Sequence, residues 1–499
     1  TGRSISKRIV LEETSESFGL WKDSTFPLLF KVYLFNVTNP EEVSRGDRPK
    51  LKELGPYVYR QYRHKFNITF DGKSKLTYYQ KKIYIFDAEK SKNFTESDQV
   101  ILLDTGMILM VNKMLKSMLA QLNGVLPLLF GYPLDPFVRC SVGDVLFNGV
   151  LINCSSDDAF VAMGSQLPPT MRPHEDPDEG FLFSMFHHQN DTLQGPYTID
   201  SGAENISRLG QVLSFEDLTE LPTWDGACSV LNGTDATIFP PVEDTNIAHK
   251  SISYVKRGSV EGLPAVHYEV GRSVLQSADT NPDNKCFCPN DWSVTRAGCA
   301  LDGVMGLEKC QKAPVVASFP HFFLGSPSLL EYVASGLQPN KLKHQTFVDI
   351  EPVSKTGAVL RGAKRMQFNM ELVQIQEITP LTNVTTGLFP LMWVEEVRLC
   401  LYLTSKHYLT SEHFISITLN YLNVYRRVKM MKVLQWVLVA TGVVLALGAC
   451  GLRGAAGRVA HGKATLGPCP RPPAAPKDGR SLDFTNRAFG VEEVIIAHR

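Results

Sequence analysis

The feature that most constrains this chain is an uncharged apolar stretch near its C-terminal end. Residues 433–452 read VLQWVLVATGVVLALGACGL, twenty residues without a charged side chain. At 1.5 Å per residue, a helix of this length spans roughly 30 Å, the thickness of the hydrocarbon core of a bilayer. A helix buried in a soluble core is seldom uncharged over such a length. The stretch therefore predicts a transmembrane helix over residues 433–452.

One face of this predicted helix carries small residues. Gly442, Ala446 and Cys450 recur at four-residue spacing, and residues four apart lie on the same side of a helix. Small residues at this spacing allow two membrane helices to approach closely. Short apolar helices also contain such stripes by chance. Two interpretations stay open, a homo-oligomer formed through the membrane helices and a helix without a partner.

Consensus sites for N-glycosylation indicate on which side of the membrane the bulk of the chain lies. The pattern N-x-[ST] occurs eight times, always before residues 433–452, and N-glycans are attached to exported domains. We therefore expect residues 1–430 to form an extracellular or lumenal ectodomain, in the plasma membrane rather than in endosomes or lysosomes. The Pro-rich residues 453–499 are expected to be a flexible cytoplasmic tail. The eight sites are Asn36, Asn67, Asn93, Asn153, Asn190, Asn205, Asn232 and Asn383.

The first residues, TGRSISKR, are polar and basic, and no initiator Met or apolar run precedes them. A signal peptide or a first membrane helix would require such an apolar run. Because an ectodomain must be delivered across the membrane, we expect the natural chain to extend further at its N-terminus.

The composition excludes several classes of function. The chain has 51 Lys and Arg against 51 Asp and Glu, which gives a net charge of zero, whereas nucleic-acid binding requires clustered basic residues. Hydrophobic residues make up 43% of the chain, which is typical of a folded protein. We find no nucleophile elbow, dinucleotide fingerprint, phosphate-binding loop or metalloprotease motif. The sequence thus indicates neither an enzyme nor a protein with a cofactor or catalytic metal.

Hydrophobic periodicity predicts β-structure followed by helices and then β-structure again. Residues 26–37 form an apolar run, and alternating segments around Asp71-Gly72 predict a hairpin. The helical pattern over residues 104–122 is closed by Asn123-Gly124. Shorter helices are expected around residues 142–151 and 156–166, a loop over residues 167–180, and short strands from residue 181 onward.

The predicted helix over residues 104–122 is apolar nearly all round and rich in methionine. One interpretation is a helix buried within a helical bundle. The other is that its methionines contact a lipid-like ligand of variable shape, because methionine adapts to irregular apolar surfaces. On the second interpretation, Met107, Met114 and Met118 line the mouth of a ligand site.

The cysteines cluster in the second half of the ectodomain. Cys286, Cys288, Cys299 and Cys310 fall within 25 residues. Zinc sites favour two to four residues between paired thiolates, and C-x-C without a second matching pair fits this rule badly. On the exported side of a membrane, disulfide bonds are expected instead.

Several sequence blocks together resemble the class B scavenger receptor family, which includes the fatty-acid translocase, the lysosomal integral membrane protein and the arthropod sensory neuron membrane proteins. Two further blocks, GVLINC and KRMQFNMEL, resemble the sensory neuron membrane proteins most, and an arthropod member of the family is expected. The blocks are VLEE at 10–13, YLFNVTNPEEV at 33–43, GPYVYR at 55–60, CSVLNGTDATIFPP at 228–241, NPDNKCFC at 281–288, PHFFLGSP at 320–327, GLQPNKLKHQTFVDIEP at 336–352 and LFPLMWVEE at 388–396.

The resemblance implies a mainly β fold with helices. Its ectodomain would be a large asymmetric antiparallel β-barrel, topped by an apical helical bundle at about residues 100–180. The family pattern also implies a hydrophobic tunnel from this apex towards the bilayer and membrane helices at both chain ends. An N-terminal helix would then precede Thr1.

The resemblance also implies a disulfide pattern. Cys228 would pair with Cys286, and Cys288 with Cys299. The family partner of Cys310 is missing, because the matching stretch NIAHKSI contains no cysteine. Cys310 is then unpartnered or pairs with one of three other cysteines, which are Cys140, Cys154 and Cys400.

The family resemblance implies a membrane-anchored receptor that binds hydrophobic ligands such as fatty acids, sterols, carotenoids or pheromone-like lipids and transfers them through the tunnel to the membrane. The apical stretch LPLLFGYPLDPF at 126–137 lacks the lysines of lipoprotein-binding members, which favours a neutral or weakly polar lipid. The alternative is a receptor that docks a soluble protein, such as a lipid carrier, a lipoprotein or a lysosomal enzyme, without lipid transfer.

Overall fold

The structure is a computed structural model, and the residues that it describes lie between residue 10 and residue 399. The predicted membrane helix and tail, and the cysteines at 288, 299 and 310, lie outside them. Among the described residues, no helix combines the length and the apolar character that a bilayer crossing requires. The described ranges are 10–23, 27–72, 74–113, 119–130, 134–152, 169–176, 180–222, 224, 228–231, 233–235, 252–260, 263–287, 301–307, 314–350 and 359–399.

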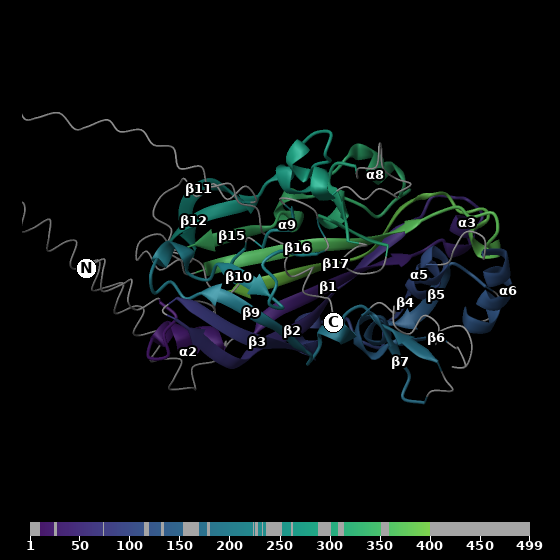
Figure 1. The fold of residues 1–499 in the computed structure, drawn as a ribbon. Helices are drawn as coiled ribbons and strands as arrows, with labels where there is room; N and C mark the ends of the chain where they lie inside the picture. Colours follow the sequence, from purple (N-terminus) through teal and green to yellow (C-terminus); the bar gives the residue numbers. More distant parts are fainter. Residues whose placement is uncertain are drawn as a thin grey trace, which may run out of the picture. The chain divides into compact units, whose positions relative to one another are not determined.

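Strands are the main elements of the described chain (Figure 1). The strands are β1 (Leu28–Val37), β2 (Leu51–Asp71), β3 (Lys75–Phe86), β4 (Gln99–Leu103), β5 (Phe137–Ser141), β6 (Val150–Ile152), β7 (Met171–Pro173), β8 (Phe181–Phe183), β9 (Leu193–Asp200), β10 (Val212–Phe215), β11 (Ile252–Val260), β12 (Leu263–Val270), β13 (Val304–Gly306), β14 (Val315–Ser318), β15 (Phe347–Ile350), β16 (Val359–Leu372) and β17 (Gly387–Leu399).

Helices are shorter and fewer among these residues. The α-helices are α2 (Glu16–Lys22), α3 (Pro40–Ser44), α4 (Ala88–Ser91), α5 (Thr105–Lys113), α6 (Leu119–Phe130), α8 (Pro327–Glu331) and α9 (Lys341–His344). The single-turn helices are η2 (Asp144–Asn148), η5 (His187–Gln189), η6 (Ile206–Arg208), η8 (Arg272–Leu275), η9 (Pro282–Phe287), η10 (Pro320–Phe322) and η11 (Thr379–Leu381).

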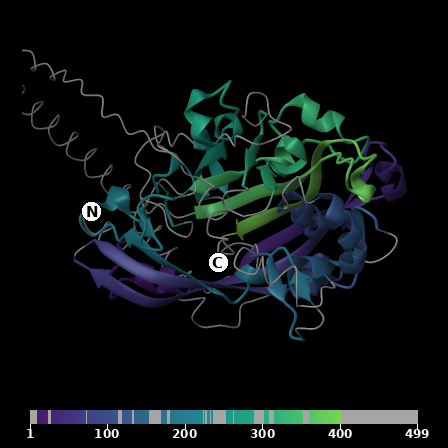
Figure 2. The same cartoon turned by 45° about the vertical axis from the view of Figure 1, so that its right-hand side comes forward.

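One large antiparallel sheet organises the fold. Ten of its strands follow the order β10-β9-β3-β2-β1-β17-β16-β15-β12-β11, and β14 joins β13 to β16. Among the described strands, this pairing begins at β10 and ends at β11, so their ladders do not close the sheet. The predicted mainly β fold with a large antiparallel sheet is confirmed, whereas its closure into a barrel stays a prediction. Figure 2 shows the long strands β2 and β3 diverging from the strands β15 and β16.

The long central strands form where the sequence predicts them. The apolar run LLFKVYLFNV becomes β1, which lies between β2 and β17. Phe30 of β1 faces Tyr59 on β2 and Glu396 on β17. The hairpin predicted at Asp71-Gly72 is confirmed, because Asp71 pairs with Lys75 at the start of β3. Local alternation and a turn signal are sufficient here because the hairpin partners are adjacent in sequence.

The helical region lies at one end of the long strands, with α5 and α6 beside β4 to β7 (right in Figure 1). The predicted helical segment is present, but its predicted end at Asn123-Gly124 is wrong, since these residues lie within α6. Leu126 and Leu129 beyond them are buried in the main core. The Asn123 amide oxygen accepts the N–H of Thr379 at 2.9 Å. Tertiary packing thus overrides a local stop signal.

Two other expectations can be compared with the structure in this region. Residues 142–148 are helical, as expected around 142–151, but the helix ends at Asn148 and β6 begins at Val150. Gly149 has φ +109°, a conformation that ends a helix and favours glycine. The predicted loop over residues 167–180 contains β7, which pairs with β8. The helix predicted at 156–166 lies outside the described residues.

The largest hydrophobic core lies between the inner face of the long strands and the helical region. It joins Phe30, Tyr59 and Phe389 of the sheet to Ile108 of α5 and Leu126 of α6. Burying large aromatic and aliphatic side chains contributes roughly 1.5–3 kcal/mol each. This core fixes the helical region on the sheet and thereby positions the cavities described below.

A disulfide bond joins two distant segments of the described chain. Cys228 and Cys286 are bonded, with 5.9 Å between their Cα atoms and 58 residues between them in sequence. The pair that the resemblance implies is thus present in the structure. Both cysteines belong to a second core that is centred on Trp21, Tyr78 and Tyr197.

Candidate functional site: two adjoining internal cavities

A cavity lies between the helical region and the sheet. Its volume is about 290 Å³, roughly twice that of an apolar cavity known to hold benzene. Nine helices and strands, and the loops beside them, contribute its described lining residues. It is lined by Leu34, Leu102, Leu103, Asp104, Thr105, Gly106, Leu129, Phe130, Val138, Val145, Val150, Leu151, Ile152, Phe183, Met185, Leu391 and Met392. We call it the apical cavity.

Among the described residues that line the apical cavity, Asp104 is the one with a titratable side chain. It precedes α5 directly, and its Oδ1 atom accepts the N–H of Met107 at 2.9 Å. Burial raises the pKa of Asp104 to about 6, although hydrogen bonds from the backbone of Met107 and Gly106 oppose the shift. A carboxylate in an apolar cavity loses hydration, which is the physical cause of this shift.

Gly106 keeps the apical cavity open beside Asp104. A Cβ atom at this position would lie 2.8 Å from Cδ1 of Ile152 and 3.5 Å from the ring of Phe130. Both neighbours also line the cavity. Glycine here therefore leaves space that any other residue would fill.

A second cavity, of about 110 Å³, adjoins the first along the inner face of the sheet. The two cavities share the lining residues Thr105, Phe183, Met185, Leu391 and Met392. The remaining lining residues are Phe30, Lys82, Tyr84, Leu109, Thr170, Phe186, His188, Gln189, Val315, Lys364, Met366, Phe368, Met370, Val394 and Glu396. We call it the sheet cavity.

The sheet cavity has both apolar and polar residues in its lining. Glu396 accepts hydrogen bonds from Gln61 at 2.9 Å and from Arg63 at 3.0 Å. Gln61 also donates to the hydroxyl of Tyr84 at 2.8 Å. Arg63 and Gln61 are buried. Since Lys364 faces Glu396 across the strands, charged groups lie on the inner face of the sheet, where an amphiphile could place a polar group.

The structure places the predicted ligand-contact methionines as follows. Met107 has no exposed surface, belongs to the main core and does not line either cavity. A ligand would meet Met107 only after the helix had moved. Met114 and Met118 lie outside the described residues. Ligand contact by the three methionines stays a prediction.

The residue that the sequence reasoning missed is Asp104, which lies at the start of the helix predicted over 104–122. Its only local signal is its position before an apolar helix, which is typical of a capping residue. The walls that make it a cavity residue come from distant segments such as 150–152, 183–185 and 391–392.

The described cysteine in this region is Cys140 on β5, which has a free thiol and is buried. Burial, and secondly the negative charges of Asp104 and Asp144, raise the pKa of Cys140 to about 12. The thiol is therefore neutral at physiological pH and is a poor nucleophile.

The predicted glycosylation sites fall into three groups in the structure. Asn67, Asn93, Asn205 and Asn383 are exposed. Asn36 and Asn190 are half-buried, and their amide oxygens accept the N–H groups of Ile101 at 2.8 Å and Tyr84 at 3.1 Å. Asn153 and Asn232 lie outside the described residues. Attachment of glycans at the eight sites stays a prediction.

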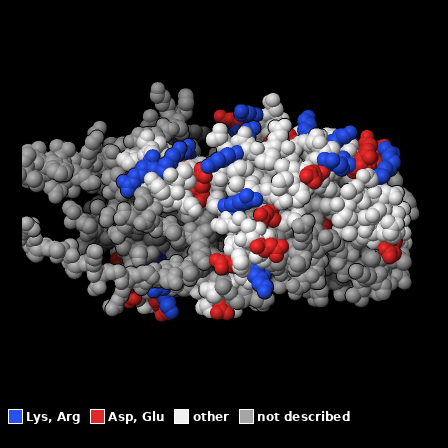
Figure 3. Space-filling view, turned by 90° about the horizontal axis from the view of Figure 1, so that it is seen from above, with Lys and Arg blue, Asp and Glu red and all other residues white. Residues whose placement is uncertain are grey.

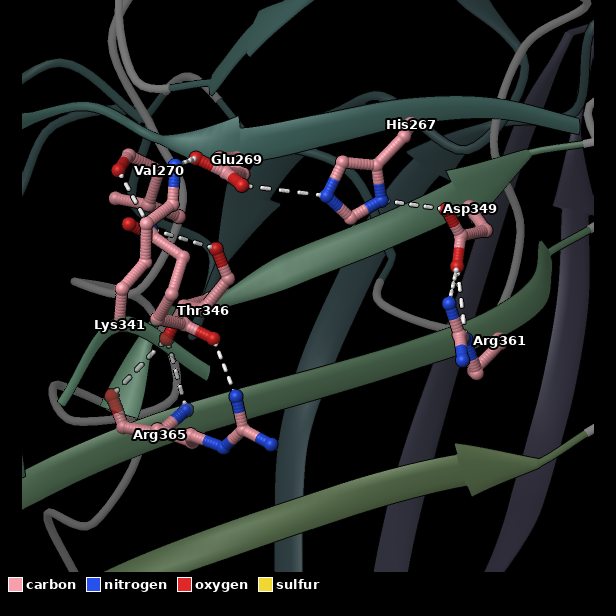
Figure 4. A network of polar contacts seen from close by, with 9 residues as sticks. His267, Glu269, Val270, Lys341, Thr346, Asp349, Arg361 and Arg365 are labelled. Carbon is pink, nitrogen blue, oxygen red and sulfur yellow. Dashed lines mark hydrogen bonds and ion pairs between the residues drawn. The ribbon is translucent and has the colours of Figure 1, made fainter. Parts of the chain in front are cut away.

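A separate polar network crosses β12, β15 and β16 (Figure 4). His267 lies between two acids, with Nδ1 2.6 Å from Asp349 and Nε2 3.4 Å from Glu269. Arg361 contacts the second oxygen of Asp349 at 2.8 Å, and Lys341 contacts Glu269 at 2.9 Å. Each acid thus has a basic partner, which is typical of a network that stabilises the fold.

Charged side chains of both signs lie on the face of the described chain that is seen from above in Figure 3. Figure 3 shows acidic side chains among the basic ones over most of the face seen from above. Within the described part of the chain, no group of three or more histidine, cysteine or acidic side chains has an arrangement that could hold a metal ion.

The chain belongs to the CD36 family, because the model of that family matches residues 2–452. The resemblance to the class B scavenger receptors is thereby confirmed. The chain is similar to sensory neuron membrane protein 2 of Manduca sexta, with 40% identity over 413 residues, or 79% of either chain. Sensory neuron membrane protein 2 of Ostrinia furnacalis is 39% identical over 416 residues, again 79% of either chain.

A second group of relatives carries a different number in its name. Sensory neuron membrane protein 1 of Pediculus humanus subsp. corporis is 32% identical over 467 residues, which cover 89% of this chain and 85% of the relative. These relatives are insect proteins and are named as membrane proteins, in agreement with the branch that GVLINC and KRMQFNMEL predict.

Proposed function

We propose that the chain is a membrane-anchored receptor that takes up a hydrophobic small molecule in the apical cavity and passes it through the sheet cavity towards the membrane. The observation that carries this proposal is the pair of adjoining cavities, which share five lining residues. Apolar side chains dominate both linings. Membership of the CD36 family supports a receptor rather than an enzyme.

Removal of apolar surface from water would drive the uptake. Each buried CH2 group contributes roughly 0.8 kcal/mol, so a long alkyl chain gains enough free energy to bind without a strong charged anchor. A mainly apolar pocket with a few polar groups is the usual form of a site for such a molecule.

The described part of the apical helix bears on the alternative, a receptor that docks a protein. Residues 107–111 of α5 are all buried, so they offer no apolar surface to a partner. This observation favours small-molecule binding over docking through this part of α5.

Met185 lies in the wall common to both cavities and provides the test. Tryptophan at position 185 would fill the passage, whereas leucine has nearly the volume of methionine and serves as the matched control. The full chain, reconstituted in vesicles, is given a fluorescent long-chain lipid, and both binding and transfer to the bilayer are followed.

We expect Met185→Trp to slow transfer about tenfold or more, since the larger side chain would fill the space next to the wall that both cavities share. Met185→Leu should transfer at nearly the wild-type rate. Equal transfer by the wild-type chain and Met185→Trp would refute the proposed passage. Absence of any saturable lipid binding would refute the receptor function itself.

A further inference from the structure

We propose that Asp104 makes the apical cavity a site for the hydroxyl group of a long-chain alcohol. The inference rests on the proposed function, which it deepens by naming the head group that the cavity would select. The carboxylate would accept a hydrogen bond from the hydroxyl, and the alkyl chain would lie against the apolar lining.

The position of Asp104 supports this assignment. It lines a cavity of about 290 Å³ whose other lining residues are uncharged. Its capping bonds go to the backbone of Gly106 and Met107, and an ionised carboxylate offers about four acceptor positions. The cap therefore uses only part of the acceptor capacity of Asp104. Asp104 lines a space large enough for part of an alkyl chain.

Among the described residues of the cavity lining, none is basic. The negative charges of Asp104 and of Asp144 on η2 both act on the buried thiol of Cys140 on β5. The lining residues from β1, β4, α6, β6, β8 and β17 are uncharged. A ligand with a hydrogen-bond donor would replace hydration that the carboxylate has lost.

This chemistry discriminates among head groups of similar size. A hydroxyl can donate to the carboxylate, whereas an aldehyde or an acetate ester can only accept, and a fatty acid carboxylate would be repelled. A buried polar group left without its partner is costly, so a site built around an acceptor rejects head groups that lack a donor.

The protonation state of Asp104 predicts that this preference depends on pH. With the pKa of Asp104 raised to about 6, the group is ionised at neutral pH and mostly protonated at pH 5. The protonated form can donate to a carbonyl oxygen. Discrimination against the aldehyde should therefore weaken on acidification.

The test uses competition in the full chain. A long-chain alcohol with a photoreactive diazirine in its alkyl chain labels peptides from the cavity wall, which mass spectrometry identifies. Dodecanol, dodecanal, dodecyl acetate and dodecanoate compete with the label, and cholesterol separates a straight-chain alcohol from a membrane sterol. For each variant we take the ratio of the competing strengths of two compounds. Comparing this ratio between variants removes the effect of each compound's partition into detergent or lipid.

Asp104→Asn is the informative variant, because asparagine caps a helix as well as aspartate does. It removes the charge and replaces one acceptor oxygen by an NH2 donor. Asp135→Asn is the matched control. The Oδ1 atom of Asp135 also accepts a backbone N–H, that of Phe137 at 2.9 Å, but Asp135 does not line the apical cavity.

At neutral pH we expect dodecanol to compete at least about tenfold better than dodecanal in the wild-type chain and in Asp135→Asn. In Asp104→Asn the advantage of dodecanol should be small, because the hydrogen bond from the hydroxyl to a charged group is lost. The wild-type preference should also fall at pH 5. An unchanged preference in Asp104→Asn, or no preference in the wild-type chain while the wall is labelled, would overturn the inference. If the alcohol labels no peptide that lines the cavities, both this inference and the proposed function fail.

Discussion

Two aspartates in different regions of the molecule have opposite surroundings. Asp349 is buried, whereas Asp104 is half-buried. Asp349, in the network on β12, β15 and β16, contacts His267 at 2.6 Å and Arg361 at 2.8 Å. Asp104, in the wall of the apical cavity, is held only by backbone N–H groups among its described contacts. One carboxylate has basic partners, while the other has an apolar cavity.

The difference separates a structural acid from a candidate binding acid. When one partner of a buried ion pair is removed, the other charge is left uncompensated and the fold loses stability. A carboxylate with amide partners alone keeps acceptor capacity and carries a raised pKa, two properties that are common in functional sites. Substitution of each aspartate, followed by a measurement of stability, tests this difference.

The largest effect is expected from Asp349→Ala. The substitution removes the buried carboxylate that contacts both His267 and Arg361, although the Arg361 side chain is 46% exposed. A hydrogen bond to a charged group contributes about 1.5–3 kcal/mol, so the loss of both should cost about 3–5 kcal/mol. Thermal denaturation of the full chain, followed by tryptophan fluorescence, measures the loss of stability. A loss below about 1 kcal/mol would show that Asp349 is no more important to the fold than a surface residue.

Asp104→Asn should have the opposite effect at neutral pH. Because the pKa of Asp104 is raised from 3.8 to about 6 in the folded chain, its stabilising contribution is fully present below pH 3.8 and is lost as the pH rises through 6. The variant should therefore be more stable than the wild-type chain by about 3 kcal/mol at pH 7.5.

The advantage of Asp104→Asn should disappear towards pH 4. Denaturation of both chains over this pH range provides the measurement. Parallel pH profiles for the two chains would mean that Asp104 is as well hydrated in the fold as in the unfolded chain, and the contrast with Asp349 would be lost.

Glu53 offers a third acid with the reverse pH dependence. Burial alone would raise its pKa, but hydrogen bonds from His321 at 2.6 Å and Trp393 at 2.8 Å outweigh burial and lower it. Its contribution to stability is therefore present above pH 4.5 and is lost as the pH falls through the lowered pKa. We expect Glu53→Gln to cost about 1–2 kcal/mol at neutral pH and to flatten the acid limb of the denaturation profile. An unchanged acid limb would contradict this assignment.

The sequence predicts the parts of the fold that depend on neighbours in the chain. The alternation around Asp71-Gly72 was sufficient for the β2–β3 hairpin, because its partners are adjacent. The end of the helix at Asn123-Gly124 was predicted wrongly because Leu126 and Leu129 gain more from burial than the local stop signal costs. Residue patterns alone did not reveal the Cys228–Cys286 pair, which came from the family resemblance.

The candidate site was less accessible to sequence reasoning. The methionine pattern directed attention to Met107, which the structure places in the core. Asp104, three residues earlier, carries the signal of a capping residue and nothing more. Its place in a cavity depends on side chains from β1, β6 and β17, which no local pattern relates to it.

The smallest effect is expected at the rim of the network on β12, β15 and β16. Lys341 contacts Glu269 at 2.9 Å, but 61% of the surface of its side chain is exposed. Water already solvates such a lysine, so an exposed ion pair contributes at most about 1 kcal/mol and is weakened by salt. Lys341→Ala should therefore lower stability by less than about 1 kcal/mol, as thermal denaturation at low and high salt would measure. A loss as large as that of Asp349→Ala would mean that the network acts as one cooperative unit, in which the burial of each member matters less than its connection to the others.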